Sequence, residues 1–274
     1  MNTTQISSRN TESSAQKKYI RQHKRHHHFV AFIRFLVLFS FLIIWESSAR
    51  LGLIDTFFFS SPSMVFLYFI KMLKDGSFFS NTGITLLETL ISFLLVTALS
   101  LLTATLLWYS KTLSEILEPY LVVLNSLPKS ALAPLFIVWL GTGTDTIVVA
   151  GISVALFGSV ISLYTGFKHV DEEKLKLVYT LGGNRFTALI KVVLPASIPA
   201  ILSNMKVNVG LALVGVIIGE FLAARRGLGY LIIYGTQVFQ LNMVITSIII
   251  LCMIAMALYQ CIQFIEHLYK KKTM

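Results

Sequence analysis

The side chains that could do chemistry in this chain are polar or charged groups placed inside long apolar stretches. One set recurs at intervals of three and four residues, the spacing that puts side chains on one helix face: Thr82, Thr85, Thr89 and Ser92, with Glu88 beside them. A second stripe carries two amides, Asn204 and Asn208. Hydroxyl, amide and carboxyl groups in such surroundings hydrogen-bond polar solutes, so we interpret both stripes as candidates for lining a path through a membrane.

Four ionisable side chains inside the apolar stretches have two interpretations each. Such groups are costly in hydrocarbon and usually face a cavity or a partner. For Glu88 and Lys129, a pore-facing position and a packing position are both open. For Lys206 and Glu220 we favour packing or reaching toward the interface at a helix end. The full set of pore candidates is Thr85, Glu88, Thr89, Ser92, Ser126, Lys129, Asn204 and Asn208.

Motifs of enzymes are missing from the sequence. It contains no HExxH, no GxSxG and no GxxxxGK[ST] phosphate loop. Cys252 and Cys261 have a spacing that gives neither a metal pattern nor a disulfide framework. We therefore expect no catalytic residue, no metal and no cofactor in this chain.

The composition fixes the class of protein. The chain has 274 residues, of which 55% are hydrophobic and 13% charged, with a mean hydropathy of +0.74. Soluble domains carry about 25% charged residues, so these values indicate an integral membrane protein. Alternating strand patterns are absent, which leaves an all-α membrane protein as the predicted fold class.

Six stretches are long enough to cross about 30 Å of hydrocarbon as helices. We place them near residues 29–50, 82–108, 116–140, 145–166, 198–222 and 241–267. Pro128 and Pro134 in the third stretch predict kinks. Gly215 and Gly219 in the fifth form a GxxxG pattern that allows two helices to approach closely.

The basic residues predict the orientation. With six spans, 16 Lys and Arg residues fall on the side of the two termini and 5 on the other side. The positive-inside rule then places both termini in the cytoplasm. The net charge of +10 therefore indicates topology and contact with anionic lipid, and we expect no nucleic-acid partner.

The N-terminal segment differs from the rest. Residues 1–28 are polar and then basic, which predicts a disordered cytoplasmic tail before a membrane domain at 29–270. The first apolar stretch is too long, and too far from the N-terminus, for a cleaved signal peptide, so we expect a retained anchor. Residues 61–75 are short and end in Lys74 and Asp75, which indicates a helix lying in the outer interface.

The loop at residues 168–197 is too apolar to be only solvated. Acidic residues 171–173 suit a helix start, and the pair Gly182 and Gly183 breaks the helix. A second short helix, 186–193, is expected to end at Pro195, and Pro199 to help begin the fifth span. We predict two short helices that meet at a glycine corner and dock on a partner protein.

This loop resembles the conserved cytoplasmic loop of binding-protein-dependent ABC importer permeases. That loop has the form Glu-Ala-Ala, three residues, Gly, nine residues, an aliphatic, one residue, Leu-Pro. Gly182, Val192, Leu194 and Pro195 match it, whereas residues 176–178 (Lys-Leu-Val) replace the opening triad.

Two further segments resemble one subgroup of these permeases. Residues 119–141, PYLVVLNSLPKSALAPLFIVWLG, are similar to the third-span signature of permeases for sulfonates, nitrate and taurine, a subgroup that includes transporters of thiamine and riboflavin precursors. Residues 219–232, GEFLAARRGLGYLI, give a third match in the right order.

The resemblance implies a type I ABC importer permease fold in the bacterial cytoplasmic membrane. It implies a second permease subunit, which we expect to be another copy of this chain. It also implies a dimer of cytosolic ATPase subunits that alone hydrolyses ATP, and an extracytoplasmic substrate-binding protein. The residues it assigns to ATPase coupling are Lys176, Leu177, Leu181, Gly182, Gly183, Arg185, Phe186, Leu194 and Pro195.

Other functions and substrates stay open at this point. A secondary transporter would need a coupling-ion site and often an internal repeat. An ABC exporter would need longer cytoplasmic helices, and an intramembrane enzyme would need a nucleophile with its base. Within the importer interpretation we expect a small organic anion, best an aliphatic sulfonate, with nitrate or a vitamin precursor as alternatives.

Overall fold

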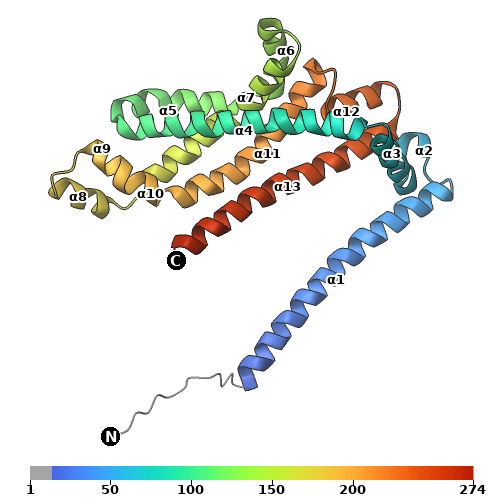
Figure 1. Cartoon of the computed structure of the whole chain (residues 1–274), viewed down its shortest axis with the longest axis horizontal. Coiled ribbons are helices and arrows are strands. Elements are labelled where there is room, and N and C mark those ends of the chain that lie inside the picture. Colours follow the sequence, from blue (N-terminus) through green and yellow to red (C-terminus); the bar gives the residue numbers. More distant parts are fainter. Residues whose placement is uncertain (1–13, 274) are drawn as a thin grey trace. The chain divides into compact units, whose positions relative to one another are not determined.

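The structure is a computed structural model that describes the backbone of residues 14–273, and every regular element in that range is a helix (Figure 1). The predicted all-α fold is therefore confirmed for the described residues. The contacts divide the chain into two units, residues 1–63 and residues 64–274, which are described in turn.

The first unit contains α1 (Ser14–Arg50) and the short α2 (Thr56–Phe59). The apolar part of α1, Phe32–Arg50, is long enough to cross a membrane. The disordered tail predicted for residues 1–28 is not what the structure shows from Ser14 onward, because residues 14–28 continue α1. They contain no Gly or Pro and are rich in residues of good helix propensity, so nothing stops the helix from extending. Residues 1–13 lie outside the described residues.

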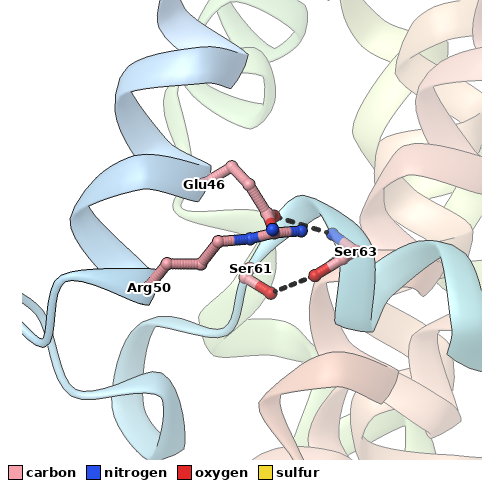
Figure 2. Close-up of polar contacts among 4 residues, drawn as sticks. All are labelled: Glu46, Arg50, Ser61 and Ser63. Carbon is pink, nitrogen blue, oxygen red and sulfur yellow. Dashed lines mark hydrogen bonds and ion pairs between the residues drawn. The ribbon is translucent and has the colours of Figure 1, made fainter.

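A small polar cluster joins the end of α1 to the turn that follows α2. Figure 2 shows Glu46 between two donors: the Arg50 guanidinium at 2.7 Å and the backbone N–H of Ser63 at 3.1 Å. The hydroxyl groups of Ser61 and Ser63 lie 2.9 Å apart. Glu46 therefore caps the Ser63 N–H in the first turn after Pro62, where a carboxylate is also favoured by the helix dipole.

The second unit is a bundle of long helices with short ones at its ends. Its elements, of which the first begins at the unit boundary, are α3 (Pro62–Lys74), α4 (Ser77–Tyr109), α5 (Lys111–Ser126), α6 (Lys129–Leu140), α7 (Thr144–Lys168), α8 (Glu172–Thr180), α9 (Arg185–Ala188), the π-helical turn η1 (Leu189–Val193), α10 (Leu194–Ala196), α11 (Ile198–Ala223), α12 (Leu228–Gln237) and α13 (Leu241–Thr273). The core of the unit is α7 packed against both α4 and α11. Figure 1 shows α8 and α9 at one end of this bundle and α12 at the other.

Close contact between α11 and α7 depends on two glycines of the predicted GxxxG pattern. A Cβ atom on Gly215 would lie 2.7 Å from the Cα of Gly151, and one on Gly219 would lie 2.8 Å from the Cα of Ile147. The helices approach to a distance that only a missing side chain permits, so the predicted close approach is confirmed.

Five described helices are long and apolar enough to span a membrane: Phe32–Arg50, Ser77–Tyr109, Thr144–Lys168, Ile198–Ala223 and Leu241–Lys271. The third predicted span, 116–140, is not one kinked helix. It is the pair α5 and α6, bent by 96° at a two-residue break. Six spans result when this pair is one of them.

The break follows from Pro128. Its ring disfavours helical backbone at the residue before it, and Leu127 is extended, with ψ 141°. Pro128 also lacks the N–H that would continue the helix. By contrast, Pro119 and Pro134 lie inside α5 and α6.

The broken pair runs from one end of the bundle to the other. α5 starts next to the end of α4, where Trp108 meets Arg185 of the loop 168–197. α6 ends next to the start of α7, where Ile147 lies against Gly219 near the far end of α11. Together α5 and α6 therefore cover the same depth as one span.

Candidate translocation path and coupling segment

The stripe of hydroxyl groups on α4 lies inside the helix bundle of a single chain. Thr85, Thr89 and Ser92 are fully buried, and Glu88 is 1% exposed. The Ser92 hydroxyl donates to the Val148 carbonyl of α7 at 3.3 Å. These four predicted pore residues are therefore enclosed in the bundle of their own chain, where Ser92 bonds to α7 and Thr85 to Glu220 of α11.

The two amides of α11 are also held internally. Asn204 and Asn208 both donate through Nδ2 to the hydroxyl of Ser159 on α7, at 2.7 and 2.8 Å. One serine thus joins two turns of α11 to α7. The sequence pattern identified the amides but not Ser159, which lies 45 and 49 residues away along the chain.

Glu220 is the centre of a buried polar cluster that the sequence interpretation missed. Its carboxylate accepts the Thr85 hydroxyl at 2.6 Å and the backbone N–H of Gly229 at 2.5 Å, and its own exposure is 0%. Glu88 lies next to this carboxyl group. The prediction that Glu220 has a packing role fits this position, although it lies in the interior and does not reach toward the interface.

The same cluster fixes the loop between α11 and α12. The Thr85 hydroxyl accepts the N–H of Leu228 at 2.9 Å, and the side-chain carbonyl of Asn81 accepts the N–H of Gly227 at 2.9 Å. Gly227 has φ +117°, and a Cβ there would lie 2.5 Å from the Glu220 carboxyl carbon. Three successive N–H groups, 227–229, are therefore bound by side chains of α4 and α11, which makes this loop rigid.

Lys206 has a partner on another helix. Its ammonium group lies 2.5 Å from Glu266 of α13, which also pairs with Lys270 at 3.0 Å. The Lys206 and Glu266 side chains are 18% and 13% exposed. This pair joins α11 to α13, as the packing interpretation of Lys206 expected.

The break between α5 and α6 is the opposite case, because it is polar and exposed. Ser126, Leu127, Pro128 and Ser130 are all exposed on the single chain. The ammonium group of Lys129 donates to the carbonyls of Leu124, at 3.1 Å, and Asn125. These carbonyls end α5, so a cation neutralises the negative end of that helix.

The loop 168–197 forms the predicted glycine corner. Asp171 caps α8 by accepting the Glu173 N–H at 2.9 Å, and Asn184 caps α9 by accepting the Thr187 N–H at 2.8 Å. Between the two helices Gly182 has φ +81°, a left-handed conformation that favours glycine.

The end of this loop differs from the prediction. Pro195 does not stop the helix, because the chain continues through η1 and α10 to Ser197. In η1 the Leu194 N–H bonds to the Leu189 carbonyl five residues back, and this wider turn comes just before the proline that has no N–H to donate. Pro199 lies in the first turn of α11, as expected.

The loop has two faces. Leu177, Leu181 and Phe186 are 59%, 78% and 56% exposed. On the other face, Leu189 and Val193 are buried in a cluster with residues of α4 and α7, and Leu194 packs against it. Lys176 is exposed and pairs with Glu172 at 3.7 Å, and Pro195 is exposed as well.

The comparisons with known proteins agree with this architecture. The family model "binding-protein-dependent transport system inner membrane component" matches residues 96–273. A relative in Haemophilus influenzae, named as a probable ABC transporter permease, is 31% identical over 85% of this chain and 94% of its own.

Other relatives carry different substrate names. A Bacillus subtilis protein named for the transport of aliphatic sulfonates is 28% identical over 78% of this chain and 77% of its own. A Halalkalibacterium halodurans protein named as a formylaminopyrimidine transport permease is 29% identical over 69% of this chain and 75% of its own.

A solved structure has the same fold. A chain of the inward-facing methionine ABC transporter MetNI superposes with a TM-score of 0.60 at 16% identity, covering 68% of this chain and 92% of that chain. The family model covers well over half of the chain, and this removes the secondary transporter, exporter and enzyme alternatives. The chain belongs to the family of binding-protein-dependent inner membrane transport components and is an ABC importer permease.

Proposed function

We propose that two copies of this chain form the translocation path of an ATP-driven importer and meet at the break between α5 and α6. The observation that carries this proposal is the exposure of the break on a single chain. Non-helical backbone at membrane depth is tolerated only where protein covers it or where it lines a water-filled cavity. Lipid cannot satisfy these groups, so a second copy and the path between the copies must do so.

The side chains around the break suit this role. Ser126 and Lys129 are the pore candidates that a solute between two copies can reach, whereas the other six are enclosed in their own bundle. On α6, Val138 and Trp139 are 81% and 68% exposed. An exposed apolar surface at the far end of the helix that follows a polar break fits a subunit contact that borders a hydrated path.

Cross-linking tests the subunit contact. In a chain with Cys252→Ser and Cys261→Ser, a single Val138→Cys is expected to give disulfide-linked dimers in native membranes. Ser92→Cys serves as the control, because Ser92 is fully buried within one chain. Monomers only from Val138→Cys, under oxidation that links a known dimer, would count against this interface.

ATPase docking is proposed for the exposed face of α8 and α9. Leu177, Leu181 and Phe186 lie within ten residues and are exposed on a segment outside the spans. A cytosolic ATPase dimer with apolar grooves would cover them, and a separate binding protein would deliver substrate on the opposite side. Lys176 replaces the Glu of the Glu-Ala-Ala triad and Leu177 its first Ala, so this chain presents a cation and a larger apolar side chain at these two positions.

The glycine corner offers a test of docking. Gly182→Leu has open space around its side chain, so its effect comes only from the backbone strain of φ +81°. We expect the variant to enter the membrane but to lose ATPase stimulation by loaded binding protein. Gly210→Ala, also in open space but without a positive φ, is the matched control. Undiminished stimulation in Gly182→Leu would remove the docking role.

Both termini are proposed to be cytoplasmic, in a bacterial inner membrane. The support is the 16-to-5 distribution of basic residues. Single cysteines at Lys74 and Arg226 are expected to react with an impermeant thiol reagent in intact cells, and one at Asn184 is not. Labelling of Asn184 alone would reverse the orientation.

The substrate proposed is a small organic anion, best an aliphatic sulfonate. The support is the Lys129 cation beside exposed hydroxyl donors, which favour oxyanions, together with the relative named for aliphatic sulfonates. A relative named for formylaminopyrimidine keeps a vitamin precursor as an alternative, and nitrate is another anion of suitable size.

Growth of a deletion strain separates these substrates. We expect a defect with ethanesulfonate as the sole sulfur source, restored by the wild-type gene and not by Lys129→Met. A defect confined to nitrate as the nitrogen source, or to precursor-limited medium, would assign the alternative substrate.

A further inference from the structure

Arg185 is an exposed residue of the loop 168–197, and its side chain reaches the end of a long helix. Its guanidinium donates to the carbonyl of Trp108 at 2.8 Å and lies 5.5 Å from the centre of the Trp108 ring. Trp108 is in the last turn of α4, 77 residues earlier in the chain. Arg185 thus contacts a different helix from the ones that its own segment continues into.

The position of this contact explains its chemistry. The last carbonyls of a helix have no partner within the helix and carry its partial negative charge, so they favour a cation. A planar guanidinium can donate along its edge and stack on an indole at the same time, which a lysine ammonium cannot do. Arg185 and Trp108 also border a cavity of about 290 Å³ that is lined by Lys111, Glu115 and Lys168.

The loop 168–197 reaches the long helices by two kinds of connection. It is covalently continuous with α7 on one side and, through α10, with α11 on the other. Its connection to α4 is only noncovalent: the Arg185 contact and the apolar cluster in which Leu189 and Val193 pack against Leu107 and Trp108.

The far end of α4 is attached to the loop between α11 and α12. Asn81 and Thr85, in the first turns of α4, bind the N–H groups of Gly227 and Leu228. A helix of 33 residues is about 50 Å long. α4 therefore extends from the proposed ATPase-docking segment to a rigid loop at the opposite end of the bundle.

We propose that Arg185 is a positioning residue that transmits movement of the α8–α9 segment to α4, and through α4 to the loop at residues 227–229. The inference rests on the proposed function, since it requires an ATPase to move the segment. It assigns Arg185 a contact inside the permease, and leaves docking on the ATPase to Leu177, Leu181 and Phe186.

The test measures docking and transmission separately in the complete complex. Arg185→Met keeps a long side chain but removes both contacts with Trp108, and Arg185→Lys keeps only the charge. Lys174→Met is the matched control, because it removes an exposed cation of α8 that is not among the residues assigned to ATPase coupling. Co-purification of the ATPase measures docking, and we expect all three variants to retain it.

Transmission is measured by spin-label distances between the two copies, with and without ATP and vanadate. Labels replace Leu87 on α4 or Val214 on α11, which are 55% and 49% exposed, in a chain with Cys252→Ser and Cys261→Ser. In wild type both labels are expected to move. In Arg185→Met the shift at Leu87 should fall at least about fivefold, while that at Val214 persists because α11 is covalently continuous with the segment.

The outcomes are distinguishable. Wild-type movement at Leu87 that persists in Arg185→Met overturns the inference, and so does loss of ATPase co-purification in that variant, which would make Arg185 a docking residue. If the wild-type chain retains no ATPase and neither label responds to ATP, the proposed function itself falls. Arg185→Lys is expected to resemble Arg185→Met, and a fully active Arg185→Lys would contradict the requirement for a guanidinium.

Discussion

The buried stripe on α4 and the break between α5 and α6 have similar compositions and opposite surroundings. Both place hydroxyl and ionisable groups within apolar spans. In the stripe, the hydroxyl groups of Thr85 and Ser92 bind α7, α11 and the loop at 227–229 of the same chain. The break is exposed, and its lysine binds only the end of its own span. Polar residues in a span can therefore hold a bundle together or face a path, and only the neighbouring elements distinguish the two.

The largest expected effect is a loss of stability when Glu220, which binds the buried stripe on α4, is replaced. Glu220→Leu removes the acceptor of the Thr85 hydroxyl and the Gly229 N–H and leaves both donors buried. We expect a loss of about 4 kcal/mol in the free energy of unfolding, measured by denaturation in detergent. The control Glu115→Leu, at a side chain that is 66% exposed, should change it by less than about 0.5 kcal/mol. Equal stability of the two variants would refute the structural role of the stripe.

A smaller effect is expected from a single hydroxyl of the stripe. Thr85→Val conserves volume but removes one bond to Glu220 and one from Leu228, so a loss of about 2 kcal/mol is expected in the same measurement. Thr82→Val is the matched control, since the Thr82 hydroxyl is buried with no hydrogen-bond partner, and it should be neutral or stabilising. Reversal of this order would show that the bonds to the 227–229 loop do not stabilise the bundle.

A substitution at the break between α5 and α6 is expected to lower transport more than stability. Lys129→Met removes the cation at the end of α5, which should lower stability by about 1 kcal/mol or less. Uptake of labelled ethanesulfonate into vesicles should nevertheless fall about tenfold, because one charge near an anion is worth about that much. Lys129→Arg should keep most of the uptake. A variant that is unstable yet transports normally would place Lys129 with the structural group.

The smallest effect is expected at Ser126. Its hydroxyl donates to the Val122 carbonyl of its own helix at 2.9 Å and is exposed. Ser126→Ala should leave the free energy of unfolding within about 0.5 kcal/mol of wild type. Any change should therefore appear in uptake alone, and a thermal shift as large as that of Thr85→Val would place Ser126 in the buried group.

Much of the fold could be predicted from residue types. Hydropathy gave the positions of the spans, the Gly182 corner was predicted from two glycines, and the close packing of α11 from Gly215 and Gly219. These features are local, because each depends on a residue's own backbone or on the absence of its own side chain. The break at Pro128 was expected only as a kink, since the sequence does not say whether the freed carbonyls find a partner.

The rest depends on partners distant in the chain. Helical spacing showed that Thr85 and Ser92 share a face but could not show which helix that face contacts. The sequence places Glu220 at a helix end and Arg185 within a family motif, but their bonds to Thr85 and Trp108 span 135 and 77 residues. The exposed and buried polar groups therefore looked alike in sequence.

The bond between Thr85 and Glu220 also determines the order of folding events during synthesis of this protein. Because 135 residues separate the two, α4 leaves the ribosome on the order of ten seconds before its carboxylate partner exists, at ordinary rates of synthesis. During that interval the Thr85 hydroxyl lacks its Glu220 acceptor. The polar cluster closes only when α11 and the start of α12 arrive, so completion of the bundle is a late event in biogenesis, and a chain interrupted before that point would present an unsatisfied polar face to membrane quality control.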